Sequence, residues 1–467
     1  MQRNIFFEIE RDNKILEYKG SDGAPLWLFM RNSLFNLLST IVFHDAAVQQ
    51  ARPYNAQMLQ YMAKAMWHNF RMFFARKKAS VVFYTISREV VVNQKFFNQY
   101  TDDYASLIPE DSITIEHPPL DWKWKFPRHN NKLIFSGPWL TVCSLWAKFF
   151  KQDAEKIHLL MACVKERVEQ ICGVTLTDEQ CQSIIAETMY LQGQTKVYAK
   201  WLVRAVKRYG AKCIVMLGGS YPWYYYLNKE FKDHNIISAD LQHGWISATN
   251  YVYNYDQSLV TNPGVITAAP DYYLCYGNYW AEKTNIPYKD KIAFGNPYRS
   301  NTIRNFQKQE GNKIVLIGCS RNTSAYLELA EHLKGACAGA EIIFRPHPTE
   351  RLETQKLMES GKYSCQIDMG SDLYTLLSQT RILISEISTV LFESIGLIDN
   401  IFVWKTEYSN HLFPDNLFAG FATKEELLAL VQDQPSHEVT ADDIWDPAWK
   451  ENFMRFYQER ILQQEKN

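Results

Sequence analysis

The stretches EIIFRPHP at residues 341–348 and SDLYTLLSQTRILISEISTVLFESIGL at residues 371–397 decide the fold of this chain. Each contains a short apolar run, Ile342–Phe344 in the first and Ile382–Ile384 in the second, as expected of buried parallel strands. Polar residues follow each run, where a buried strand has no need of them. In an open α/β sheet, ligands bind at the carboxyl ends of the strands. The pattern therefore predicts an α/β sheet with a binding site at that edge.

The residues after the first run are Arg345-Pro346-His347-Pro348. The two prolines hold the backbone extended, so the histidine between them points in a fixed direction. A lone histidine after a strand is more often structural, and the flanking prolines shift the balance toward a functional one. An imidazole N–H at this place would stabilise charge on a leaving phosphate, with Arg345 as a neighbouring cation.

The residues after the second run are Ser385-Glu386-Ile387-Ser388-Thr389, and a helical pattern follows over Ser388–Leu397. Free N–H groups at a helix start attract anions, and serine and threonine add hydroxyl donors. Glu393 lies about one and a half turns into this helix, within reach of a ribose diol beside a phosphate. We therefore expect a phosphate-bearing ligand, an activated sugar above all. The candidate contacts are Ser385, Glu386, Ser388, Thr389 and Glu393.

An N-capped helix with a solvated glutamate is the alternative reading of the same segment. A capping box does not explain it, because Leu391 stands where such a box has Glu or Gln.

Three loops at expected strand ends complete the candidate site, although each also fits a structural turn. Gly318 and Ser320 belong to GCSRNTS, a small-residue turn that lets backbone approach a ligand and that matches neither a Walker loop nor GxGxxG. His243 belongs to DLQHGW, where polar side chains that are costly to bury precede a glycine. Asn296 belongs to GNPY, a turn before a polar segment.

Strand candidates alternate with helical patterns, which predicts βαβ units and parallel sheets. In the first half we expect strands at Ser80–Tyr84, Ser112–Glu116, Lys132–Phe135, Cys213–Leu217, Ile236–Leu241 and Tyr272–Tyr276. In the second half we expect them at Ile314–Ile317, Ile342–Phe344, Ile382–Ile384 and Ile401–Trp404. Long helical stretches are expected over residues 1–78 and 151–209.

A polar, aperiodic segment at residues 298–312 predicts an interdomain linker. Residues 1–297 then form one Rossmann-like domain with helical additions, residues 313–448 form a second, and residues 449–467 form a C-terminal helix. The expected fold class is α/β, with two Rossmann-like domains facing a central cleft.

Composition excludes several classes of protein. The chain has 467 residues and a formal net charge of −1, so it has no basic field for nucleic acid. The nine cysteines are scattered and odd in number, which indicates a reduced cytoplasmic protein rather than a disulfide framework. The first residues do not read as a signal peptide, and no apolar run reaches the length of a membrane span.

With these residues in place, the chain resembles the GT-B glycosyltransferases of bacterial surface polysaccharide assembly. The group includes capsule polysialyltransferases, Kdo transferases and CDP-glycerol glycerophosphotransferases. The resemblance covers mainly residues 236–405. Arg345–Pro348 is similar to the family's HP element, Ser388-Thr389 to its Ser-Ser/Thr element, and Gln242–Gly244 to its QHG element. It implies that the second domain binds the donor nucleotide, with His347, Ser388 and Thr389 on the donor phosphate, and that the first holds the acceptor.

The general base stays open, because the acidic-acidic-glycine motif of the polysialyltransferases has no match at a corresponding position. The candidates are carboxylates of the first half, Glu89, Asp103 beside Asp102, and Asp240, and, less favoured, His243.

The resulting expectation is an inverting, metal-independent transfer of a sugar to a hydroxyl of a growing surface glycan. The resemblance favours a CMP-linked Kdo or sialic-type donor. The alternatives are a UDP-sugar donor, a CDP-glycerol or ribitol-type phosphotransferase, a sugar-nucleotide 2-epimerase, and a non-catalytic binding protein of the same fold.

The expected partners are the nucleotide-activated donor and a glycan or glycolipid acceptor, with no nucleic acid, no metal and no other cofactor. We expect a cytoplasmic protein, at the inner face of the plasma membrane. The segments that could contact the membrane are Leu34–Phe43, for which a buried core helix is the first interpretation, and Arg76-Lys77-Lys78.

Overall fold

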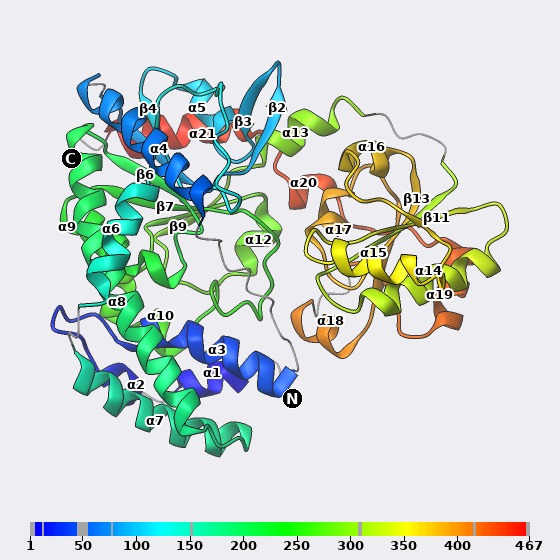
Figure 1. Cartoon of the computed structure of the whole chain (residues 1–467), viewed down its shortest axis with the longest axis horizontal. Helices are drawn as coiled ribbons and strands as arrows, with labels where there is room; N and C mark the ends of the chain where they lie inside the picture. The colour runs from blue at the N-terminus through cyan, green and yellow to red at the C-terminus, as the bar shows by residue number, and fades with distance from the viewer. Residues whose placement is uncertain are drawn as a thin grey trace.

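The computed structural model describes residues 5–11, 14–43, 55–75, 78–149, 153–306, 311–413 and 417–463. Within them the chain forms two parallel sheets, which lie in separate lobes (Figure 1). The strands of the first sheet come from residues 81–293 and those of the second from residues 313–421.

The first sheet has the strand order β5-β4-β1-β6-β7-β8-β9, and all its neighbouring strands are parallel. Its strands are β1 (Val81–Thr85), β4 (Ser112–Glu116), β5 (Leu133–Phe135), β6 (Cys213–Leu217), β7 (Ile237–Leu241), β8 (Tyr272–Cys275) and β9 (Asp290–Ala293). Most are buried on both faces, which is why they read as uninterrupted apolar runs. Every strand predicted here is confirmed to within one residue, whereas β9, which begins with Asp290-Lys291, was missed.

The second sheet has the order β12-β11-β10-β13-β14-β15, again parallel throughout. Its strands are β10 (Lys313–Ile317), β11 (Glu341–Arg345), β12 (Gln366–Ile367), β13 (Thr380–Ser385), β14 (Asn400–Trp404) and β15 (Ala419–Phe421). The four central strands are those predicted. The two edge strands, β12 (Gln-Ile) and β15 (Ala-Gly-Phe), were missed because neither contains a run of large apolar residues.

The first four helices confirm the helical character expected at residues 1–78, and further helices lie within the first lobe. They are α1 (Ile5–Glu10), α2 (Lys14–Glu17), α3 (Trp27–Phe43), α4 (Ala56–Phe74), α5 (Asp102–Leu107), α6 (Gly137–Ala147), α7 (Ala154–Cys172), α8 (Asp178–Arg208), α9 (Tyr225–Asp233), α10 (Gln257–Val260), α11 (Pro263–Ala268) and α12 (Asn278–Glu282). A hairpin of β2 (Glu89–Val92) and β3 (Lys95–Asn98) projects beyond the sheet.

Helix α3 is a core helix, because Leu34 and Leu38 are buried against the rest of the first lobe. The interpretation of Leu34–Phe43 as a membrane contact therefore fails for these two side chains. Of the basic cluster predicted as the other contact, Arg76 and Lys77 lie outside the described residues.

The stretch at residues 151–209 is two helices rather than one. Gly173 ends α7 in the left-handed conformation, with φ +65°. Thr177 then begins α8 through a capping box with Gln180.

The helices after the first sheet are α13 (Pro297–Ile303), α14 (Thr323–Ala336), α15 (Arg351–Glu359), α16 (Leu373–Ser378), α17 (Thr389–Glu393), α18 (Glu407–Leu412), α19 (Lys424–Asp433), α20 (Ala441–Ile444) and α21 (Trp449–Phe456). The start of the predicted linker is thus helical, because Asn296 caps α13 and Pro297 suits its first turn. Residues 307–310 lie outside the described residues, and the domain boundaries stay a prediction.

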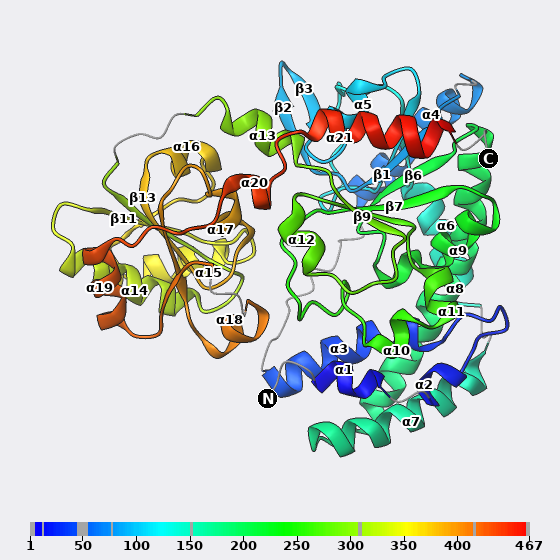
Figure 2. The same ribbon diagram turned by 180° about the vertical axis from the view of Figure 1, so that it is seen from behind.

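Helix α21 and the π-helical turn after it (Tyr457–Ile461) return to the first lobe (Figure 2). Phe453 packs with Phe83 of β1 and with Tyr104 of α5. The end of the chain therefore covers one face of the first sheet.

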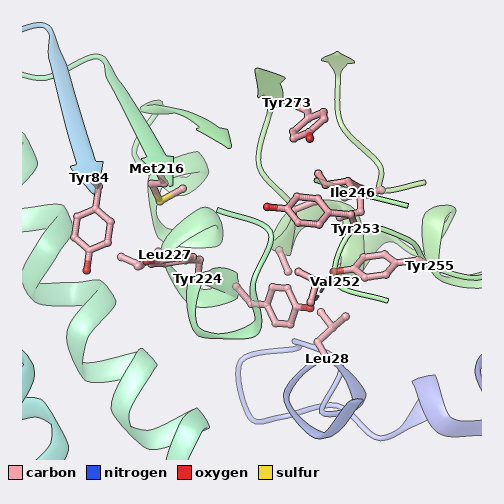
Figure 3. Close-up of a cluster of buried hydrophobic side chains, with 14 of the residues drawn as sticks. Leu28, Tyr84, Met216, Tyr224, Leu227, Ile246, Val252, Tyr253, Tyr255 and Tyr273 are labelled. Atoms are coloured by element: carbon pink, nitrogen blue, oxygen red, sulfur yellow. Dashed lines mark hydrogen bonds between the residues drawn. The ribbon is translucent and has the colours of Figure 1, made fainter. Parts of the chain in front are cut away.

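The other face of the first sheet is covered by a core rich in tyrosine (Figure 3). Leu28 of α3, Met216 of β6 and Tyr253 converge there, and all three are buried. The Tyr225 and Tyr255 hydroxyls of this core pair with each other at 2.9 Å.

Two parallel, helix-covered sheets in separate lobes, a helical N-terminal region and a C-terminal helix that returns to the first lobe constitute the GT-B architecture. The predicted fold class is confirmed.

Candidate functional site

A cleft of about 720 Å³ lies between the two sheets, at the carboxyl ends of their strands. The first sheet contributes the loops after β1, β7, β8 and β9, and the second those after β10, β11 and β13. Eight predicted site residues line this cleft: His243, Asn296, Gly318, Arg345, His347, Ser388, Thr389 and Glu393. The structure therefore brings predicted site residues from both halves of the chain together in one cleft.

His347 is held in one orientation by its neighbours. Its Nδ1 lies 2.7 Å from Oγ of Ser320 and 2.8 Å from Oγ1 of Thr349, and it accepts the Thr349 backbone N–H at 3.3 Å. Because Nδ1 is an acceptor, the neutral ring carries its proton on Nε2. Burial and the charge of Arg351 lower the pKa of His347, which favours that neutral form. The ring therefore offers an Nε2–H donor at the cleft.

The loop after β10 is built for close approach. A Cβ on Gly318 would lie 2.4 Å from the Glu350 carboxylate and 3.0 Å from the His347 backbone nitrogen, so only glycine fits. Ser320 and Asn322 adopt left-handed φ values of +73° and +59°. Such backbone strain in residues other than glycine gathers at functional sites.

The buried carboxylate of Glu350 joins this loop to the histidine. It accepts the His347 backbone N–H at 2.9 Å and the Thr323 hydroxyl at 3.0 Å. The sequence analysis missed Glu350, although it lies only three residues after His347.

Arg345 lines the cleft, but its charge is balanced by a neighbour. Its Nη1 forms an ion pair with Asp368 and donates to the Ser371 carbonyl at 3.0 Å. Burial acts to raise the pKa of Asp368, but N–H donors of Ser371 and Gly370, together with Arg345, bring it down to about 2. Arg345 thus shapes the cleft floor and is a poorer phosphate ligand than its sequence position suggested.

Two other arginines supply the positive charge of the cleft, and the sequence analysis missed both. Arg351 begins α15, lines the cleft and has an Nε that is buried without a hydrogen-bond partner in the structure. Arg88 enters from the first lobe and donates to the Tyr100 hydroxyl at 3.0 Å. The available signal for each was a basic residue within a few positions of a strand end.

Ser388 caps α17 by accepting the Val390 N–H at 3.2 Å. The helix ends at Glu393, four residues earlier than predicted. So short a helix has a weak dipole, and anion binding here depends on side chains and single N–H groups instead. Glu393 is not the solvated glutamate of the alternative reading, because it lies in the cleft wall, accepts the Tyr374 hydroxyl at 3.1 Å and has a pKa raised by burial.

His243 is the one predicted base candidate that lines the cleft. Its Nδ1 is buried and has no hydrogen-bond partner in the structure. Burial and the nearby Arg88 lower its pKa to about 4, so the ring is neutral at pH 7.

The three predicted carboxylate bases lie outside the cleft lining. Asp240 is fully buried and accepts the Gly219 and Ser220 N–H groups, each at 2.9 Å. Glu89 pairs with Lys125 and Arg128, at 2.8 and 2.9 Å. Asp103 accepts the Asn301 side chain at 3.0 Å, between α5 and α13. Each is occupied in joining parts of the fold.

Three predicted donor contacts also lie outside the cleft lining. Ser385 is buried and donates to the Ile317 carbonyl at 2.8 Å, which ties β13 to β10. Glu386 is buried between Cys319 and Thr406 and accepts from both. The Ser320 hydroxyl contacts His347, which does line the cleft, at 2.7 Å from Nδ1.

A second cavity of about 440 Å³ opens beside the cleft, at the carboxyl ends of β1 and β4. Ile86 and Ser87 line it, directly before Arg88 of the cleft. Its walls combine aliphatic and proline side chains with aromatic ones, Tyr84, Tyr198 and Trp223 among them.

Comparison with known proteins yields structural likeness only. No protein-family model matches the chain, and no curated protein is similar to it. A UDP-GlcNAc 2-epimerase from Methanocaldococcus jannaschii, in complex with UDP-GlcNAc and UDP, is 10% identical, with a TM-score of 0.44 over 81% of this chain and 99% of that one. The enzyme of that name from Neisseria meningitidis, bound to UDP-GlcNAc, is 12% identical, with a TM-score of 0.42 over 82% and 100%.

The wall teichoic acid polymerase TagF, soaked with CDPG, is 12% identical, with a TM-score of 0.37 over 92% of each chain. Identities and scores this low do not carry an activity from these proteins to this chain.

Proposed function

We propose that this protein is a glycosyltransferase of the GT-B type, which moves a sugar from a nucleotide donor to a hydroxyl acceptor. The observation that carries the proposal is the convergence of three phosphate-binding groups on one cleft. His347 offers Nε2–H from the second lobe, Arg351 lies beside it, and Arg88 faces them from the first lobe. Cations and fixed N–H donors are the groups that hold a nucleotide phosphate.

The transfer requires the acceptor hydroxyl oxygen to attack the anomeric carbon from the face opposite the leaving group. The bond between that carbon and the phosphate oxygen breaks, and its electron pair stays on the nucleotide phosphate. Donors aimed at the developing charge stabilise it, and His347 and Arg351 fill that role. The product has an inverted anomeric centre.

His243 is the best-placed group to receive the acceptor proton. It follows β7 of the first lobe, lines the cleft and is neutral at pH 7, and a neutral imidazole keeps one ring nitrogen able to accept a proton. Its low pKa makes it a weak base in the free protein. A bound phosphate would offset the charge of Arg88 and raise the pKa of His243, so the base would strengthen when donor is present.

A CMP-linked Kdo or sialic-type sugar is the donor that the sequence resemblance favours. A UDP-sugar and a CDP-linked glycerol or ribitol are the alternatives, since no described residue is assigned to recognition of the nucleobase. The reaction is proposed to be metal-independent, because Arg88 and Arg351 can compensate the phosphate charge themselves. We place it in the cytoplasm.

The second cavity is proposed as the acceptor site, and its presence supports the transferase over the 2-epimerase alternative. An epimerase acts on a single substrate and needs no site beside the donor cleft. Trp223 and Tyr224 present aromatic faces there, and His117 lies 3.3 Å from the Tyr224 hydroxyl. Aromatic faces with a few polar groups suit a sugar ring.

Donor turnover tests the proposal. The purified protein, in the presence of EDTA, is expected to release free nucleotide from one activated sugar or polyol, faster when a glycan acceptor is added. Conversion of a UDP-sugar to its epimer without acceptor would favour the epimerase. Nucleotide binding without any turnover would favour the non-catalytic protein.

A further inference from the structure

The first lobe carries an apolar surface that nothing in the described structure covers. Helices α4 and α6 pack against each other, and α6 packs on α8, leaving a groove of about 930 Å³. Trp67 is 64% exposed, Phe74 63% and Trp146 60%. Large aromatic side chains seldom stay this exposed on a monomeric soluble protein, and a contiguous apolar face of this kind marks an interaction site.

Helix α4 has apolar residues on more of its circumference than its packing requires. Tyr61, Ala65 and Met72 bury one side against the first lobe. Met66 and Phe70 lie on the opposite side and are exposed. A helix buried on one side and apolar on the other is suited to a second apolar environment.

The charged residues of the segments that form this face are all basic. Residues 56–75, 137–149 and 188–212 contain no aspartate or glutamate. Lys64 and Arg71, two helical turns apart on one flank of α4, are exposed, and Arg204 and Arg208 line the groove. The whole chain has a net charge of −1, so this region is basic against a nearly neutral background.

We propose that this face, formed by α4, α6 and the C-terminal half of α8, docks on the surface of an anionic lipid bilayer. Exposed Trp and Phe beside Lys and Arg is the composition of helices that lie in the membrane interface. The apolar side chains enter the headgroup boundary, and the basic side chains meet the lipid phosphates. Among the residues that the structure describes, no helix has the length and apolar character to cross a bilayer.

The charge pattern also argues against a second copy of this chain as the occupant. A twofold interface brings the same patch of both copies together. The charged side chains of the patch are all basic, so such an interface would bring like charges together with no acidic residue of the patch to balance them.

An aromatic path connects the docking face with the second cavity. Trp139 lines the groove and stacks on Trp201, with ring centres 5.0 Å apart, and Trp201 contacts Tyr198 of the second cavity at 5.5 Å. If the second cavity holds the acceptor, which rests on the proposed function, the acceptor site lies close to the docked face, as an acceptor anchored in lipid requires.

Vesicle sedimentation without nucleotide or acceptor tests the docking face independently of the proposed transfer. The protein is expected to sediment with phosphatidylglycerol-containing vesicles, to stay in solution with phosphatidylcholine alone, and to be released by high salt. Phe70→Ser/Phe74→Ser and Arg71→Glu/Arg204→Glu should each weaken binding at least about tenfold. The matched control is Leu159→Ser, an exposed leucine of α7 (53% exposed), which should bind as the wild type does.

Two results would overturn the proposal. One is a folded wild-type protein that does not sediment with anionic vesicles. The other is vesicle binding that survives both double substitutions. A dimer in solution that Phe70→Ser/Phe74→Ser separates, with no vesicle binding, would assign the face to self-association instead.

Discussion

Oγ of Ser320 lies 2.7 Å from Nδ1 of His347, across the ends of two neighbouring strands, β10 and β11. The two residues are 27 positions apart in the sequence and meet only because these strands pair. The contact occupies the nitrogen that would otherwise compete for the proton. It therefore fixes which side of the ring presents an N–H to the cleft.

Ser320→Ala should weaken nucleotide binding about threefold to tenfold, because one orienting hydrogen bond of about 1 kcal/mol is lost. The melting temperature should stay within error, since Ser320 is exposed. Isothermal titration with the preferred nucleotide measures this. Ser183→Ala, an exposed serine of α8, is the control. Unchanged affinity in Ser320→Ala would remove the orienting role.

Arg351→Ala should lose nucleotide affinity, whereas Arg345→Ala should lose stability. Arg351 has a buried Nε without a partner, so its loss should weaken nucleotide binding roughly tenfold or more and leave the fold intact. Loss of Arg345 leaves the Asp368 carboxylate without its ion-pair partner, so that variant should melt earlier. Isothermal titration with nucleotide and thermal melts of both variants distinguish the two roles. If Arg345→Ala loses nucleotide affinity and Arg351→Ala melts earlier instead, Arg345 binds the phosphate and Arg351 stabilises the fold.

His243 should make stability depend on pH. Its pKa is about 4 in the folded state against 6.5 for the ordinary ring. The unfolded chain therefore binds a proton more readily than the folded protein does. As a result, the contribution of His243 to the free energy of unfolding is lost as the pH falls from about 6.5 to about 4. The full shift corresponds to roughly 3 kcal/mol, reduced by solvent screening in the cleft.

Urea unfolding of the wild type and of His243→Gln across that pH window measures the effect. The stability difference between them should change with pH, and the variant should keep its nucleotide affinity while losing turnover. Parallel pH profiles would show that His243 is not buried as a neutral ring.

Asp240→Asn should lower stability rather than catalysis. The carboxylate accepts two N–H groups at 2.9 Å, and an amide can accept only one of them while its NH₂ opposes the other. The expected loss is about 1–3 kcal/mol. Chemical denaturation measures it, and turnover per folded molecule should be retained. A fully stable variant without turnover would restore Asp240 as the base.

The sequence allowed the strands and the cleft edge to be predicted because buried parallel strands are apolar without interruption and end abruptly in polar residues. His347 and Ser388 could be found in this way, since each follows such a run directly. Arg88 and Arg351 could not, because their importance depends on two lobes meeting and on which other arginine, Arg345, is already paired with Asp368. The role of Asp240 as the base stays a prediction for the same reason: a carboxylate at a strand end serves a backbone turn, as Asp240 does here, as readily as a substrate.

The exposed aromatic side chains of α4 could not be recognised either. Helical periodicity marks apolar residues as core, and only the packed structure shows that Trp67 and Phe74 face outward.

The most direct test of the nucleotide-sugar cleft is a thermal-shift screen with CMP, CDP, UDP and GDP on the wild type and His347→Ala. A ligand at about 100 times its dissociation constant adds roughly 2.7 kcal/mol of apparent stability. We expect one nucleotide to stabilise the wild type and to stabilise His347→Ala clearly less, which would identify the donor class and its phosphate site together. If none of the four stabilises the wild type, the cleft is not a nucleotide site and the transferase proposal fails.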